Sequence, residues 1–169
     1  MEELQMASKF RKAHVSMPGG ERVAMTPFGA RMFIHALASE TDGAFGVWDT
    51  FTTPGEGPAP HTHTRETEMF RVVASTYRFR CGDVVFDAPP GTIVILPPHV
   101  EHAWRNIGSE IGQMLGAVTP AGCEGMFRDI AALGQGATSR QIAEIENRYG
   151  IINEETRRLQ GCGGKTADT

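Results

Sequence analysis

The chain has 169 residues, of which 40% are hydrophobic and 21% are charged, and its formal net charge is −4. This length suffices for one domain with a sizeable core, and the composition excludes a disordered chain. The sequence has no cluster of lysines or arginines of the kind that binds nucleic acid or an anionic membrane surface. The expected partner is therefore a small-molecule substrate.

The N-terminal stretch MEELQMASKFRK lacks the apolar core of a signal peptide, and no segment approaches the roughly 18 apolar residues that cross a bilayer. We therefore expect a cytoplasmic protein. Its cysteines, Cys81, Cys123 and Cys162, are widely spaced and form no CxxC pair, which predicts reduced thiols. Residues 1–20 show little periodicity and are expected to form a flexible N-terminal arm.

Residues 21–120 contain short β-branched and aromatic runs separated by turn residues, which is typical of an all-β sandwich or barrel. In Thr76–Arg80, Tyr77 and Phe79 alternate with polar residues, which predicts a strand with one wet face. Thr92–Leu96 is apolar almost throughout, which predicts a strand covered on both faces. The expected strands are Arg22–Met25, Arg31–Ala38, Phe45–Thr52, Glu68–Val73, Thr76–Arg80, Val84–Asp87, Thr92–Leu96, His102–Asn106 and Gln113–Thr119.

Residues 121–160 show helical periodicity. Apolar residues recur at helical spacing from Met126 to Leu133, and a second helix is indicated by Thr138-Ser139-Arg140-Gln141, which matches a capping box. Gly150 is placed to end that helix. We expect these two helices to pack outside the β core and residues 161–169 to form a disordered tail.

The stretch HTHTRETEMF combines two histidines with two glutamates. Side chains two residues apart on a strand share a face, so His61 and His63 can converge on one ion. Glu66 and Glu68 lie at odd offsets from His63, so a turn must intervene before either carboxylate can join them. If the next strand begins at Glu68, that carboxylate points inward together with Phe70. A shorter turn would select Glu66, which otherwise is expected on a solvated charged face with Arg65.

This stretch and the segment from Gly91 to Asn106 resemble the two motifs of the cupin superfamily, in particular those of single-domain quercetinase-like cupins. Ser75 and His99 stand where the motifs have glycine, which leaves the shape of two turns open. The matching positions are Gly55, His61, His63 and Glu68 in the first motif and Gly91, Pro97, His102 and Asn106 in the second.

The resemblance implies a double-stranded β-helix, the cupin or jelly-roll barrel, over residues 21–120. It also implies a divalent transition metal in the mouth of the barrel, held by His61, His63, Glu68 and His102. Three imidazoles and one carboxylate suit Fe, Mn, Ni, Co, Cu or Zn. On a metal that accepts five or six ligands, this set leaves positions for water, substrate or dioxygen.

The resemblance further implies a dioxygenase that acts on a small aromatic or enol substrate. Glu68 would then be the catalytic base as well as a ligand, and Phe70 and Trp104, which share strand parity with the ligands, would contact the substrate. The same donor set permits a non-redox isomerase, cyclase or lyase, and also a small-molecule-binding barrel without catalysis. Cupins commonly pair, so a homodimer is expected.

Overall fold

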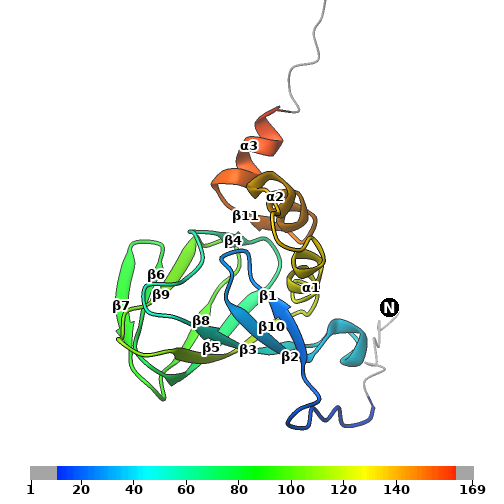
Figure 1. Cartoon of the computed structure of the whole chain (residues 1–169), viewed down its shortest axis with the longest axis vertical. Helices are drawn as coiled ribbons and strands as arrows, with labels where there is room; N and C mark the ends of the chain where they lie inside the picture. The colour runs from blue at the N-terminus through cyan, green and yellow to red at the C-terminus, as the bar shows by residue number, and fades with distance from the viewer. Residues whose placement is uncertain (1–10, 163–169) are drawn as a thin grey trace, which may run out of the picture.

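The computed structural model describes residues 11–162, whose strands form a two-sheet barrel with helices at one end (Figure 1). The larger sheet has the order β1-β2-β3-β10-β5-β8, and the smaller has the order β7-β6-β9. Every predicted strand is present, with its ends shifted by at most two residues. The bounds are β1 Arg22–Met25, β2 Arg31–Ala36, β3 Gly46–Thr52, β4 Thr62–His63, β5 Thr67–Ala74, β6 Tyr77–Cys81, β7 Val84–Ala88, β8 Ile93–Leu96, β9 His102–Asn106, β10 Gly112–Thr119 and β11 Ile151–Ile152.

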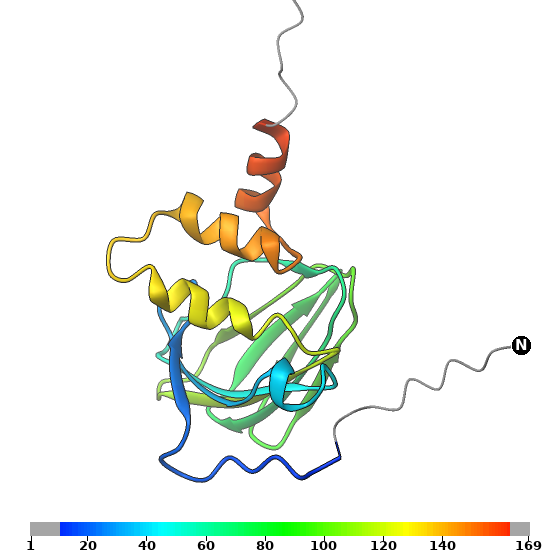
Figure 2. The same cartoon turned by 90° about the vertical axis from the view of Figure 1, so that its right-hand side faces the viewer.

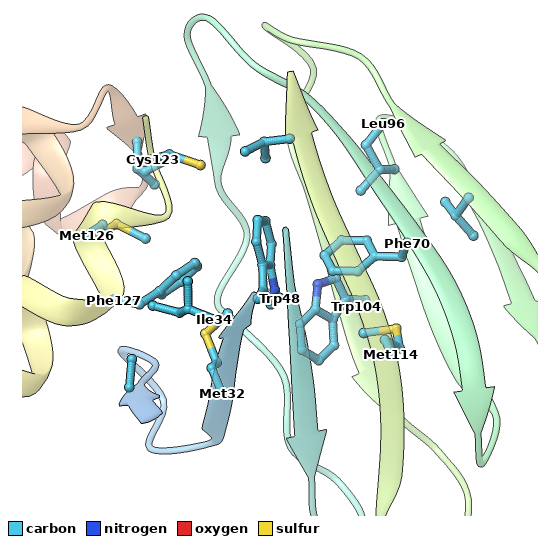
Figure 3. Packing of buried hydrophobic residues seen from close by; sticks show 14 of the residues in the cluster. Met32, Ile34, Trp48, Phe70, Leu96, Trp104, Met114, Cys123, Met126 and Phe127 are labelled. Carbon is cyan, nitrogen blue, oxygen red and sulfur yellow. The ribbon is translucent and has the colours of Figure 1, made fainter. Parts of the chain in front are cut away.

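Alternation along the strands sends one set of side chains into the barrel. Trp48 on β3, Phe70 on β5 and Met114 on β10 are each at most 2% exposed, and Figure 3 shows them facing one interior. On β6, Tyr77 and Phe79 are buried while the residue between them is exposed, which confirms the predicted wet face.

Strand β8 corrects the expectation for Thr92–Leu96. Val94 and Leu96 are buried, but Ile93 and Ile95 are 60% and 65% exposed. β8 lies at the edge of the larger sheet and pairs with β5 alone within it, so its outer face stays open. The prediction was wrong because an apolar run does not reveal whether a second layer covers the sheet.

Three helices follow the barrel: α1 (Gly125–Ala132), α2 (Ser139–Arg148) and α3 (Glu154–Cys162). The capping box at α2 is confirmed. The Gln141 backbone amide donates to the Thr138 hydroxyl at 3.2 Å, and the Thr138 backbone amide donates to the side-chain Oε1 of Gln141 at 3.0 Å. In Figure 2, α1 in yellow and α2 in orange lie along the barrel, while α3 in red projects away from it. Within residues 11–162, no helix is long and apolar enough to cross a membrane.

The chain returns to the barrel between α2 and α3. β11 pairs antiparallel with β4, with Ile151 opposite His63, and the Thr64 amide donates to the Gly150 carbonyl at 3.0 Å. Of the expected arm, residues 1–10 lie outside the described part, and His14 and Ser16 hydrogen-bond to His35 on β2. Of the expected tail, residues 163–169 also lie outside the described part.

Candidate metal centre

The loop before His61 is held against β9. The Gly55 amide donates to the Asn106 carbonyl at 2.8 Å, and His61 and His102 exchange two backbone hydrogen bonds of 2.9 Å. At Gly57, a Cβ atom would lie 1.9 Å from the Trp104 carbonyl oxygen, so glycine is required for this close approach. The loop therefore brings the His61 imidazole beside that of His102.

The other two members of the cluster come from β4 and β5. His63 lies on β4, and the turn after it leads into β5, where Glu68 pairs with Leu96 of β8. Glu68 and Phe70 are 5% and 2% exposed, so both point into the barrel, as strand parity predicts. The turn between the histidine and the glutamate is thus long enough to place Glu68, and not Glu66, among the clustered ligand atoms.

His61, His63, Glu68 and His102 each offer a ligand atom, and these atoms all lie within 4.8 Å of one another. Glu68 Oε2 is 3.4 Å from His102 Nε2 and 3.9 Å from His63 Nε2. Glu68 Oε2 and His102 Nε2 are buried and have no hydrogen-bond partner in the described structure. Buried polar atoms without partners are costly, and an ion held between them would satisfy both. The residues therefore fit a divalent transition metal, for which this donor set is suited.

The far nitrogen of each imidazole also has a neighbour. His61 Nδ1 lies 2.9 Å from the Ala59 carbonyl oxygen, and His102 Nδ1 lies 3.0 Å from that of Val100. A ring that donates through Nδ1 leaves the Nε2 lone pair for a metal, and such outer contacts fix the orientation of metal-binding histidines. The backbone thus orients two of the three rings.

For His63, the neighbour of the far ring nitrogen is the carboxylate of Glu66. Its Oε2 lies 3.5 Å from His63 Nδ1, and its Oε1 lies 3.1 Å from an Arg65 guanidinium nitrogen. The expectation of a solvated Glu66 was wrong, because the side chain is only 1% exposed. The signal for this contact is the spacing of three residues within a turn, which lets the carboxylate fold back beneath the ring.

Charge and burial set the protonation states of the cluster. Loss of water around the ring, together with the neighbouring His102 and His63, lowers the pKa of His61 to about 4. Burial opposes ionisation of Glu68, but His63 and His102 outweigh it and lower the pKa of that carboxyl. At neutral pH the site therefore offers a neutral His61 imidazole and an ionised Glu68 carboxylate, the forms that bind metals.

A cavity of about 190 Å³ opens beside the cluster. An apolar cavity of roughly 150 Å³ holds benzene, so this one suits a single substituted ring or a molecule of similar size. Phe28 packs edge-on to Trp104 with ring centroids 5.5 Å apart, which makes one wall aromatic. The main apolar lining residues are Phe28, Trp48, Phe70, Trp104, Met126 and Phe127.

Both residues expected to contact a substrate, Phe70 and Trp104, line this cavity. Trp48 does so as well, whereas His35 lies on the outer side of β2, with its Nε2 3.1 Å from Asp49 Oδ2. His99 is exposed and stands outside the cluster.

Three further residues line the cavity without any sequence signal for it: Met126 and Phe127 on α1, and Phe28 between β1 and β2. Their apolar character predicted burial, but nothing local shows that they meet the metal cluster.

Part of the chain matches a known family model. Residues 51–118 match the family model described as the cupin domain. A search of curated proteins gave no match. Among solved structures, KdgF from Halomonas sp. aligns with a TM-score of 0.56 and 15% identity over 64% of this chain and 94% of its own. An RmlC-like cupin from Shewanella frigidimarina aligns with a TM-score of 0.56 and 17% identity over 65% and 93%, respectively.

A variant of the oxalate decarboxylase OxdC from Bacillus subtilis is also similar. It aligns with a TM-score of 0.53 and 17% identity over 60% of this chain and 28% of its own. At such identities these likenesses establish the barrel fold and nothing about the reaction. The site itself rests on this chain's own residues, since the buried His61, His63, Glu68 and His102 could together hold a metal ion.

Proposed function

We propose that the protein is a metal-dependent dioxygenase acting on a small aromatic or enol substrate, and that its barrel, which matches the cupin family model over residues 51–118, holds the site. One observation carries the proposal: four convergent ligand atoms stand at the side of a small cavity with aromatic walls. A site with four protein donors leaves room on a five- or six-coordinate ion, which separates catalytic from closed structural sites.

In this proposal His61, His63, Glu68 and His102 bind one ion of Fe, Mn, Ni, Co, Cu or Zn. The ion supplies Lewis acidity toward an ionised hydroxyl or enolate oxygen and a site for dioxygen. Glu68 is also proposed as the proton acceptor, because its lowered pKa keeps the carboxylate ionised and its side chain lines the cavity beside the ion. Proton transfer requires contact with the substrate hydroxyl, which the position of Glu68 in the cavity lining supports.

Phe70 and Trp104 are proposed to bind the substrate ring. Their ring centroids lie 5.7 Å apart with an interplanar angle of 69°, so they form a corner and not a flat stack. The cavity volume of about 190 Å³ is below the roughly 300–1,000 Å³ of pockets for drug-sized ligands. We therefore favour substrates with one ring, or acyclic enols, over three-ring flavonols.

Oxygen consumption tests the proposal directly. The protein is loaded in turn with each candidate metal, mixed anaerobically with phenols, catechols and diketones, and then exposed to air. We expect a spectral change on anaerobic mixing and oxygen uptake after exposure, with at least one metal. Turnover without oxygen in the zinc form would instead assign an isomerase, cyclase or lyase, and binding without any product would assign a binding barrel.

We also propose a homodimer formed through the outer face of the larger sheet. Val73, Ile93 and Ile95 are 45%, 60% and 65% exposed on neighbouring strands of that face. The rings of Phe33 and Phe51, on the same outer face of the sheet, pack edge-on with their centroids 5.4 Å apart. Exposed apolar side chains gathered on one face commonly mark an interface.

A cytoplasmic location is proposed from cysteine chemistry. Cys81 and Cys123 are both unpaired, and Cys123 is buried. Free thiols are usual in a reducing compartment and less so in secreted proteins.

A further inference from the structure

The cavity contains a second polar group, outside the four-residue cluster. We propose that Glu146, held by Asn153, is a ligand subsite for a hydrogen-bond donor, a hydroxyl or an amine, carried by the same molecule whose oxygen binds the metal. The inference rests on the proposed function in one respect, since it takes the metal cluster as the anchor of the ligand.

Glu146 lies on α2, and Asn153 precedes α3. Both line the cavity, and both are largely buried, with exposures of 7% and 9%. Asn153 Nδ2 donates to Glu146 Oε2 at 2.8 Å. Within the described residues the side-chain hydrogen bond of Glu146 uses Oε2 alone, and Oε1 is not among the fully buried atoms without a partner. Oε1 is therefore open to the cavity, where a donor on a bound ligand can replace water.

Asn153 is itself fixed by the start of α3. Its Oδ1 accepts from the Thr156 amide at 2.9 Å, and its own amide donates to the Thr156 hydroxyl at 2.7 Å. These bonds leave Nδ2 directed at Glu146, so the carboxyl is held in one orientation before any ligand arrives. Pre-orientation of this kind favours binding because less side-chain freedom is lost.

The chemistry of Glu146 suits either donor class. Burial raises the pKa of its carboxyl, although the bond from Asn153 opposes the shift. An ionised carboxylate binds an ammonium group strongly, and either protonation state can accept a hydrogen bond from a hydroxyl. The lining that Glu146 shares with the metal cluster also includes Phe127, Met126 and Ile151, which are apolar. The ligand therefore has polar groups at two places and an apolar body between them.

Three catechols of matched length test the subsite: dopamine with a terminal amine, hydroxytyrosol with a terminal hydroxyl, and a propylcatechol with a terminal methyl. Binding to the zinc-loaded protein is measured anaerobically by calorimetry, together with zinc content. In the wild type we expect dopamine, hydroxytyrosol or both to bind at least about 10-fold tighter than the propylcatechol, as hydrogen bonds to charged groups typically allow.

The variants divide the two donor classes. Glu146→Gln keeps an acceptor but no charge, so a preference for dopamine should fall while a preference for hydroxytyrosol stays. Glu146→Leu should remove both preferences. Glu144→Gln is the matched control, because Glu144 lies on the same helix, is exposed and pairs with Arg140, and it should leave all three affinities unchanged. Zinc content should be equal in all variants.

Equal affinities of the three catechols in the wild type overturn the proposal, as does a preference that survives in Glu146→Leu or the failure of all three to bind. If Glu146→Leu does not fold, the affinities of Glu146→Gln for hydroxytyrosol and for dopamine decide. The outcome is separable from that of the oxygen test. If the protein consumes oxygen but does not prefer the catechols with a terminal donor, it lacks only the subsite. If it shows this preference without consuming oxygen, it has the subsite and is not a dioxygenase.

Discussion

The carboxylate of Glu66 lies 3.5 Å from His63 Nδ1, while the carboxylate of Glu68 lies 3.9 Å from Nε2 of the same ring. One imidazole is therefore held between two acidic side chains. Burial opposes its protonation, but Glu68 and Glu66 together raise the pKa of His63. The ring is oriented with Nε2 toward the cluster by the carboxylate on its other side.

Glu66→Gln should weaken metal binding without unfolding the protein. Loss of an outer carboxylate partner typically lowers metal affinity about 10–100-fold, because the ring is less basic and less well oriented. Competition with a chromophoric chelator measures the affinity for Zn(II), and the absorption bands of the Co(II) form report its geometry. Glu110→Gln, at an exposed position, is the control. Unchanged affinity and an unchanged Co(II) spectrum would show that Glu66 serves only the turn.

Removal of one ligand should strip the metal. In His63→Ala or His102→Ala, three donors remain, and neither change reaches the hydrophobic core around Trp48 and Phe79. We expect less than one tenth of an equivalent of bound metal, on the order of a 100-fold or greater loss of affinity, with wild-type circular dichroism. Elemental analysis of the purified variants measures the content. One full equivalent in either variant would refute the ligand assignment.

Two turns hold non-glycine residues in the left-handed region, Ser75 with φ 67° and His99 with φ 65°. They stand at the two positions where the cupin motifs have glycine. His99→Gly should stabilise the protein by about 0.5–1 kcal/mol, because a left-handed residue with a Cβ is strained. Ser75→Gly should be nearly neutral, since it also removes the 2.8 Å bond from the Ser75 hydroxyl to Asn106 Oδ1. Urea unfolding of both variants checks the difference, and an equal gain in both would contradict it.

Stability should depend on pH through Glu146. Its pKa in the folded protein is raised above the ordinary 4.5, so its contribution is fully present below that value and is lost as pH rises through the folded pKa. Glu146→Gln cannot ionise. The variant should match the wild type near about pH 4 and exceed it in free energy of unfolding near about pH 8. Urea titrations of metal-free protein at both pH values test this, with Glu144→Gln as the control. A variant less stable than the wild type at the higher pH would disprove it.

The outer face of the larger sheet should govern association. The double variant Ile93→Lys/Ile95→Lys places two charges on the most exposed apolar positions of this face. We therefore expect the variant to sediment as a monomer and the wild type to sediment as a dimer. The side chains of both isoleucines point away from the barrel, and the double variant should retain its metal. A wild type that sediments as a monomer rules out the proposed pairing.

Local patterns explain what the sequence could predict. Alternation located the strands and placed His61 and His63 on one face, and the resemblance to the cupin motifs implied the full set of His61, His63, Glu68 and His102 that the fold brings together. Such features depend on period and turn length, which short stretches contain. The cap of α3 was also readable, as Asn153 is followed by acidic residues and by Thr156, yet that helix was not anticipated.

The remaining features depend on which segments meet in space. Burial of Glu66 requires the turn after β4 to fold beneath His63, and the exposure of Ile93 and Ile95 requires that no layer cover β8. Glu146 enters the cavity because α2 packs over the mouth of the barrel, about eighty residues from Glu68 along the chain. No local sequence pattern encodes which of these segments come to lie side by side.

The pairing of Ile151 with His63 has a consequence for the order in which the protein is completed. The segment that matches the family model ends at residue 118, and His63 already accepts a 2.8 Å backbone hydrogen bond from the His99 amide within it, but the strand partner of β4 is supplied by residues 151–152. During synthesis from the N-terminus, all four side chains of the cluster emerge before that partner does. The strand pairing beside His63 can therefore form only after the C-terminal segment has been made.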